Sequence, residues 1–390
     1  MSTPTRGRRS ASGTRRACVL ARRAVLVVAV VVGGCTPAAR SSARPAPSST
    51  APAAFVYPQA AWEYHTSPEA AGWSAAGLEE VREALSQLST TGFMAVSGGR
   101  VLFEYGDVEV VSYLASVRKS VLSMLFGTYV ADGTIDLDRT LEELGIDDHQ
   151  ALTAAEKQAT IRDLLSARSG VYHPASNGGD DLASAPARGS QEPGAYYLYS
   201  NWDFNALGTI FEQETGRDIY DVLETDLARP IGMQDFDRTL HRKSGDLDVS
   251  RHPAYHMHLS TRDMARIGYL MLREGNWAGT QLVPREWVKE STRLVTPRAE
   301  MNPDRHRDGS FGYGYLWWVF DDPRLDPEYE GAYAGHGAVG QHILVVPALD
   351  LVVAHKTRPG EGRRVSHEEF HAVARLLVAA HCGTSCPDAQ

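Results

Sequence analysis

Basic residues are scarce in most of this 390-residue chain. The formal net charge is −9, although the first 34 residues carry seven arginines and no acidic residue, so the remainder carries −16. Because nucleic-acid binding requires a basic surface, we expect no nucleic-acid partner. Beyond residue 34 the chain also lacks any run of 18 consecutive apolar residues, which argues against a membrane-spanning helix in that part. Its composition, 43% hydrophobic and 22% charged, is typical of a globular protein.

Residues 1–34 have the pattern of an export signal. The arginines precede the apolar run AVLVVAVVV, which is too short to cross a bilayer but fits the core of a signal peptide. The run ends in VGGC, which resembles a bacterial lipobox and implies cleavage before Cys35 and lipid attachment to its sulfur. The expected location is therefore the outer face of the bacterial cytoplasmic membrane, held only by the lipid. In the alternative, Cys35 is incidental and the protein is secreted.

Cysteine is rare, and its four positions are informative. Cys18 would leave with the signal, and Cys35 would begin a tether over residues 35–54, which are rich in Pro, Ala and Ser. The other two, Cys382 and Cys386, could form a small disulfide loop outside the cytoplasm. We expect residues 55–390 to form one domain.

Periodic segments from residue 74 onward predict an α/β fold of the α+β type. Residues 74–88 have helical spacing after a serine cap, and two strand-like runs flank Gly98 and Gly99 in a hairpin pattern. Strand patterns return at 313–320 and 342–355, and a final helix is predicted over 366–381. This order predicts one antiparallel sheet built from both ends of the chain, flanked by helices and interrupted by an inserted helical subdomain.

Ser116 and Lys119 begin an otherwise apolar helical segment. Residues three apart lie on one face of a helix, so the two side chains point the same way, whereas Arg118 points elsewhere. A lysine that is buried at the start of a helix loses its proton more readily and can then activate a serine hydroxyl. The alternative is a solvated first turn without catalytic meaning.

A second segment, YYLYSNW, places Tyr199 and Asn201 just before another predicted helix. The tyrosine could relay a proton, and Asn201 could contact a substrate carbonyl or hold Lys119. The alternative is an aromatic loop that packs its own core.

Together these motifs resemble the serine β-lactamase-like, penicillin-recognising superfamily, in its class C-like branch. Segments around them are similar to 6-aminohexanoate-oligomer hydrolases and related esterases, over residues 73–381. The resemblance implies a β-lactamase/transpeptidase-like fold and a small ester, amide or peptide substrate, with no cofactor. It also implies that Ser116 is the acylated nucleophile, Lys119 its base and Tyr199 the proton shuttle.

The third motif of that superfamily, K-[ST]-G on a strand, is where this sequence departs. Its one match, KSG at residues 243–245, lies in a polar segment that predicts a loop. We instead assign His336, Gly337 and Ala338, which lead into an apolar strand. The N–H groups of Ala338 and Ser116 would then form the oxyanion hole, with Val339 as the alternative register. His336 and Gly337 would contact substrate, and the missing lysine argues against a true β-lactamase.

Other functions fit parts of the sequence. A β-lactamase or D,D-peptidase, or a non-catalytic penicillin-binding-like sensor, would keep the same motifs. HEEFH at residues 367–371 matches a zinc-protease motif, but no glutamate follows it, so we expect both histidines to be structural and no metal to be bound. HMH at 256–258 similarly predicts packing at a strand end. The long polar segment 174–194 predicts a rim of the site.

Overall fold

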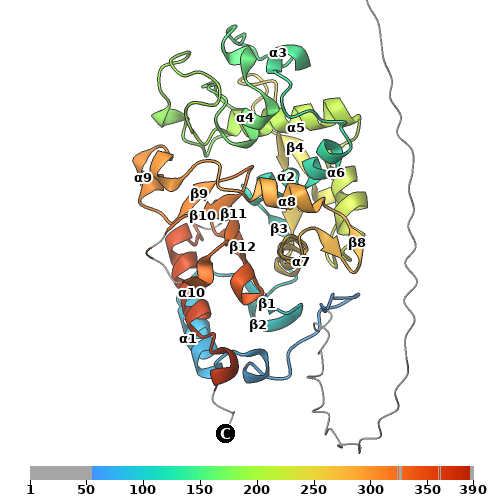
Figure 1. Ribbon diagram of the computed structural model, residues 1–390, viewed down its shortest axis with the longest axis vertical. Helices are drawn as coiled ribbons and strands as arrows, with labels where there is room; N and C mark the ends of the chain where they lie inside the picture. Colours follow the sequence, from blue (N-terminus) through green and yellow to red (C-terminus); the bar gives the residue numbers. More distant parts are fainter. Residues whose placement is uncertain (1–54, 323, 325–326, 359, 361, 387–390) are drawn as a thin grey trace, which may run out of the picture. The chain divides into compact units, whose positions relative to one another are not determined.

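A seven-stranded antiparallel sheet lies at the centre of the domain (Figure 1). The computed structural model describes residues 55–322, 324, 327–358, 360 and 362–386. The expected signal, Cys35 and the tether lie outside the described residues. In spatial order, the strands are β2 (Arg100–Gly106), β1 (Gly92–Ser97), β13 (Leu351–Lys356), β12 (Gln341–Val346), β11 (Tyr333–Gly337), β10 (Trp318–Phe320) and β9 (Phe311–Tyr313).

The sheet joins the two ends of the domain. The hairpin β1–β2 comes from its beginning and the other five strands from its end, and β1 pairs with β13 from Gly92 opposite Lys356 to Ser97 opposite Leu351. The predicted α+β architecture, with one sheet from both ends of the chain, is therefore confirmed. Among the described residues, no helix is both long and apolar enough to span a bilayer.

Both faces of the sheet are covered by helices, which explains why its central strands are continuously buried. On β1, Phe93 and Ala95 belong to the core beneath α1 (Ala75–Ser86) and α10 (His367–Ala379). Met94 and Val96 point to the opposite core, beneath α7 (Thr261–Leu272). Alternating side chains point to opposite faces of a strand, so a sheet buried on both sides has no polar alternation.

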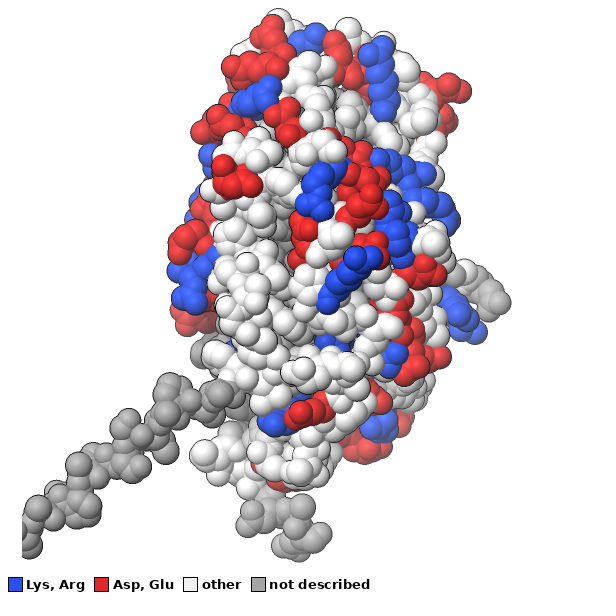
Figure 2. Space-filling view, turned by 90° about the vertical axis from the view of Figure 1, so that its right-hand side faces the viewer, with Lys and Arg blue, Asp and Glu red and all other residues white. Residues whose placement is uncertain are grey.

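The inserted segment between β2 and β9 carries the remaining helices and three small sheets. The helices are α2 (Val117–Ala131), α3 (Leu141–Leu144), α4 (Ile161–Leu165), α5 (Asn201–Thr215), α6 (Ile219–Val222), α8 (Arg285–Ser291) and α9 (Asp304–Arg307). The small sheets pair β3 (Ser112–Tyr113) with β6 (His258–Leu259), β4 (Arg242–Ser244) with β5 (Ala254–His256), and β7 (Asn276–Trp277) with β8 (Thr280–Gln281). On the face in Figure 2, acidic and basic side chains are interspersed.

Two local predictions need correction. The strand expected over 313–320 is divided into β9 and β10, because Leu316 has a φ of 63° and Gly314 N–H donates to Trp317 O in a tight turn. The KSG segment was predicted to be a loop, but its first two residues belong to strand β4. That strand is exposed and pairs only with β5, outside the central sheet.

Candidate active site

Ser116 lies at a strained turn that leads into α2. The preceding residue, Ala115, has a φ of 48°, a left-handed conformation that residues with a side chain seldom adopt. The Ala115 carbonyl accepts hydrogen bonds from the backbone N–H of Arg118 at 3.4 Å and from its guanidinium at 3.1 Å. Such strain persists only where the surroundings fix it, and it is common at functional sites.

Lys119, one turn into α2, is the centre of a polar cluster in an otherwise apolar interior. Its side chain is 1% exposed. Its Nζ lies 2.9 Å from Ser116 Oγ, 2.7 Å from Tyr199 Oη and 2.7 Å from Asn201 Oδ1. The sequence-predicted residues of the first two motifs therefore meet around one nitrogen.

The surroundings of Lys119 disfavour its charged form. Burial lowers the pKa of Lys119 well below its usual value, and the charge of Arg118 lowers it further, whereas Asp180 opposes the shift. The guanidinium of Arg118 is itself buried and lies over the ring of Tyr255. The charge of Arg118 therefore bears on the protonation of Lys119, an electrostatic influence that the sequence analysis did not give it.

Removing the charge of Arg118 is expected to change the pH dependence of turnover. A lysine acts as a base only when neutral, so the rate should rise with pH through the pKa of Lys119. In Arg118→Met that pKa should be higher, and the acid limb of kcat/KM for p-nitrophenyl butyrate should move to higher pH. Arg118→Lys keeps the charge and serves as the control. Identical acid limbs in wild type and Arg118→Met would contradict the electrostatic role.

Tyr199 is held as a neutral phenol. Burial raises the pKa of Tyr199 to about 12, against a smaller opposing effect of its hydrogen bond with Ser116. Its ring packs beside Phe204 and Trp318, with centroid separations of 4.8 and 5.7 Å. A protonated tyrosine that contacts the lysine beside the nucleophile is suited to pass a proton to a leaving group.

Asn201 is fully engaged by the protein. Its Oδ1 accepts from Lys119, its Nδ2 donates to Gly178 O at 2.9 Å, and its backbone N–H donates to Asp180 Oδ2 at 2.9 Å. Of the two roles predicted from the sequence, these contacts favour holding Lys119 over contacting substrate. They also attach segment 174–194 to the site.

Glycines of β11 allow the sheet to lie close to α2. A Cβ on Gly337 would be 2.7 Å from Leu114 O and 3.1 Å from Ser116 N, so a side chain there would displace the nucleophile. The next residue, Ala338, lines the pocket that holds Ser116, whereas Val339 lines a neighbouring one. Ala338, but not Val339, therefore lines the same pocket as Ser116.

His336 is oriented differently from the glycine that follows it. Successive side chains of β11 point to opposite faces, and the His336 ring lies on the α10 side, stacked on Trp318 with a centroid separation of 5.5 Å. Burial lowers the pKa of His336 well below its usual value, and the charges of His367 and His371 lower it further. His336 is therefore a neutral imidazole where the superfamily's third motif has a cation.

The pocket above Ser116 has a volume of about 280 Å³. Segment 174–194 contributes part of its wall, which confirms the predicted rim. The lining residues are Ser116, Gly179, Asp180, Asp181, Tyr199, Arg305, His306, Trp318, His336, Ala338 and His367.

Several of these residues carried no local signal in the sequence. Asp181 forms an ion pair with Arg305 of α9 and also lies 2.6 Å from His306 Nε2. This cluster links segment 174–194 to α9 across the pocket. The sequence predicts only that Trp318 belongs to a strand, but in the structure its ring contacts the rings of both Tyr199 and His336.

The histidines of the HMH segment and the two C-terminal cysteines lie outside the pocket above Ser116. His256 ends β5, and its Nδ1 lies 3.0 Å from Tyr113 Oη, consistent with the predicted packing at a strand end. Cys382 and Cys386 form a disulfide just after α10. The α10 motif itself begins with exposed His367.

Comparison with known proteins identifies similar chains. The family model described as "Beta-lactamase" matches residues 81–374. A 6-aminohexanoate-dimer hydrolase from Paenarthrobacter ureafaciens is 25% identical over 305 residues, 71% of this chain and 74% of that protein. Among solved structures, a family VIII carboxylesterase has a TM-score of 0.56 at 14% identity, covering 79% of this chain and 99% of that one. A β-lactamase from Mycobacterium bovis has a TM-score of 0.54 at 18% identity, covering 77% and 99% respectively.

Proposed function

Because the chain belongs to the beta-lactamase family, we propose that it is a serine hydrolase that cleaves an ester or amide bond through an acyl-enzyme on Ser116. The observation that carries this proposal is the position of Lys119 Nζ, within 2.9 Å of Ser116 Oγ and 2.7 Å of Tyr199 Oη. From the sequence alone, we propose further that the protein is exported and attached to the membrane by lipid on Cys35.

In the acylation step, neutral Lys119 accepts the proton of Ser116 as Oγ attacks the substrate carbonyl carbon. The resulting oxyanion is stabilised by the N–H groups of Ser116 and Ala338. Tyr199 donates its proton to the leaving oxygen or nitrogen as the bond to the acyl carbon breaks. The phenolate then regains a proton from the Lys119 ammonium, so the site returns to its starting charge.

Deacylation uses the same groups with water as the nucleophile. Neutral Lys119 accepts a proton from water as the water oxygen attacks the ester carbon of the acyl-enzyme, either directly or through Tyr199, which takes that proton and passes its own to Lys119. The same two N–H groups stabilise the second oxyanion. When the Ser116 ester bond breaks, the proton returns to Oγ and the acid product leaves.

Esters are the substrate class we favour. An alkoxide or phenoxide leaves more readily than an amine, and a β-lactam additionally presents a carboxylate that a cation would bind. His336 is neutral and so does not supply that cation. A solved structure with a similar fold is named a carboxylesterase, which supports an ester substrate. The similar protein from P. ureafaciens is named a 6-aminohexanoate-dimer hydrolase, and the two units of such a dimer are joined by an amide bond.

We therefore expect kcat/KM for p-nitrophenyl butyrate to exceed that for nitrocefin by a large factor. The ester rate should rise from acid toward mildly alkaline pH, because a larger fraction of Lys119 is then neutral. Both substrates are measured from pH 5 to 10 in EDTA, since a free metal ion can itself promote β-lactam hydrolysis. Nitrocefin turnover equal to the ester rate would favour a β-lactamase, and no turnover of any ester would favour the sensor.

A further inference from the structure

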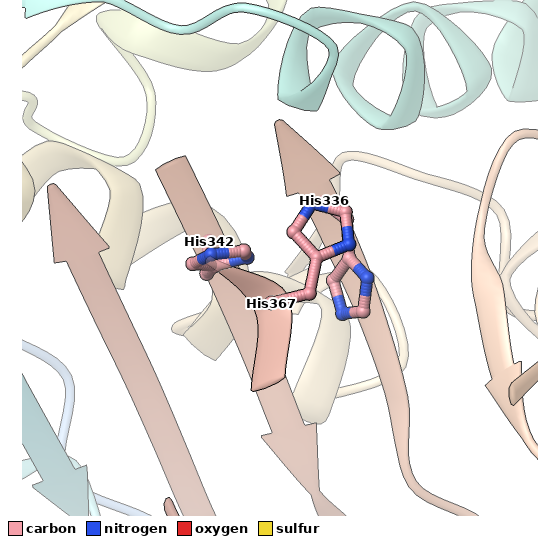
Figure 3. A group of neighbouring side chains, drawn as sticks. All are labelled: His336, His342 and His367. Atoms are coloured by element: carbon pink, nitrogen blue, oxygen red, sulfur yellow. The ribbon is translucent and has the colours of Figure 1, made fainter. Parts of the chain in front are cut away.

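Three histidines that are distant in the sequence lie together on the α10 face of the sheet. His336 on β11 and His342 on β12 are directly opposite in the strand register, and His367 is the first residue of α10. Figure 3 shows the three rings close together over two neighbouring strands of the sheet. One ring nitrogen from each lies within 4.8 Å of the others. The three histidines come together only when α10 packs on the sheet, so their positions in the sequence do not predict the group.

The ring of His342 is buried although no hydrogen bond from the described part of the chain stabilises it there. It is 0% exposed, and neither ring nitrogen has a hydrogen-bond partner among the described residues. Its ring stacks on Phe370, with a centroid separation of 4.2 Å, which leaves both nitrogens free in the ring plane. Buried polar atoms in proteins are almost always paired with protein or water, so two unpaired nitrogens on one buried ring are open to a ligand.

A neighbouring histidine provides an internal comparison. His355 on β13 lies opposite His342 and is equally buried. Its Nδ1 lies 2.8 Å from Gly340 O and its Nε2 lies 3.0 Å from Thr90 Oγ1. Hydrogen bonds to both ring nitrogens therefore explain the burial of His355, whereas no such bonds within the residues that the structure describes explain the burial of His342.

The cluster is accessible from solvent on one side. A pocket of about 560 Å³ is lined by His336, His367 and His371, among other residues, so an ion that enters it meets the rings of His336 and His367 first, whereas buried His342 does not line it. His371 Nε2 also lies 3.2 Å from His336 Nε2 and helps to orient that ring. His336 and His367 additionally line the pocket above Ser116, so the cluster adjoins the candidate active site.

We propose that His336, His342 and His367 bind one transition-metal ion of the zinc class. Three imidazole nitrogens suit Zn²⁺, Co²⁺ or Ni²⁺ rather than Ca²⁺ or Mg²⁺, and three protein ligands leave a fourth position open to the pocket. Zn–N bonds of about 2.0–2.1 Å place tetrahedral ligands about 3.3 Å apart, so the rings close modestly around the ion. This departs from the sequence-based expectation of no metal, because the HEEFH motif alone lacked ligands that β11 and β12 supply.

The bound ion has a consequence that rests on the proposed hydrolase function. It places a positive charge beside His336, at the third-motif position where this sequence has no lysine. The loaded enzyme therefore binds acyl groups that carry a carboxylate more tightly than the metal-free enzyme does. Turnover of a neutral ester at Ser116 does not need the ion.

The metal site is tested by Co²⁺ binding to untagged, chelator-treated protein. We expect about one equivalent to bind, with the visible absorption bands of a tetrahedral site, and Zn²⁺ to displace it. His367→Ala and His342→Phe should lose the bands; exposed His367 begins a helix and Phe fits beside Phe370, so both are expected to fold. His381→Ala, an exposed histidine outside the cluster, should keep them. Failure of the wild type to bind, or undiminished binding by His367→Ala, would overturn the site.

A second measurement separates the metal site from the hydrolase proposal. With Zn²⁺ bound, KM for mono-p-nitrophenyl succinate should fall severalfold, while kcat/KM for p-nitrophenyl butyrate should be the same with Zn²⁺ or EDTA. Stoichiometric binding without a change in the succinate KM would overturn the role of the charge. Absence of all ester turnover alongside Co²⁺ binding would reject the hydrolase and leave the site supported.

Discussion

Replacing Ser116 with alanine is expected to lower kcat/KM for p-nitrophenyl butyrate by on the order of 10³-fold or more, as loss of a covalent nucleophile does in other hydrolases. The substitution removes one oxygen from the start of α2 and leaves the Ala115 turn and the proposed oxyanion donors in place. Thermal unfolding should therefore be nearly unchanged. Steady-state kinetics measure the loss of kcat/KM, and the melting temperature measures the stability.

The matched control is Ser120→Ala, one turn further along α2. Ser120 Oγ donates to Leu316 O at 2.7 Å and is buried, so the variant should lose about 1 kcal/mol of stability while keeping turnover. Ser116→Ala should therefore lose activity and keep its stability, whereas Ser120→Ala should lose stability and keep its activity. A fully active Ser116→Ala would contradict an acyl-enzyme at that residue.

Replacing Lys119 with methionine is expected to lower kcat/KM by on the order of 10²–10⁴-fold, the usual contribution of a general base. Methionine fills a similar volume but neither accepts the Ser116 proton nor returns one to Tyr199. Because the loss lies in the chemical step, kcat should fall more than KM changes. A variant with normal kcat would show that Lys119 is only a packing residue.

The same variant has a distinct signature in stability. The pKa of Lys119 is lowered in the folded protein, so the unfolded chain binds more protons between that pKa and the unfolded value of about 10.4. The free energy of unfolding of the wild type should rise with pH across this interval, relative to Lys119→Met. Chemical denaturation of both proteins at several alkaline pH values measures the difference. A pH-independent difference would contradict a depressed pKa.

The contact between Ser116 and Lys119 was predictable because it is local. Ser116 and Lys119 are one helical turn apart, so their spacing alone places both side chains on one face of α2. Strand patterns near both ends of the domain likewise predicted a shared sheet, since buried strands have a recognisable apolar character. The motif around Tyr199 could be placed near them only through the family resemblance, because 80 residues separate it from Lys119.

The walls of the site could not be predicted in the same way. Asp181 and Arg305 meet across 124 residues, and no periodicity in either segment indicates the contact. The orientation of His336 depends on which face of β11 it occupies, and that depends on strand register rather than on the HGA motif itself. The grouping of His342 with His367 likewise requires the packing of α10 on the sheet.

The most direct test of the proposed mechanism is covalent labelling of the wild type with a fluorophosphonate, followed by peptide mass spectrometry. We expect one label per chain, located on Ser116, together with loss of esterase activity in proportion to labelling. Ser116→Ala should take up no label, and Ser120→Ala should be labelled like the wild type. A label on any other residue, or complete inactivation without modification of Ser116, would contradict Ser116 as the nucleophile.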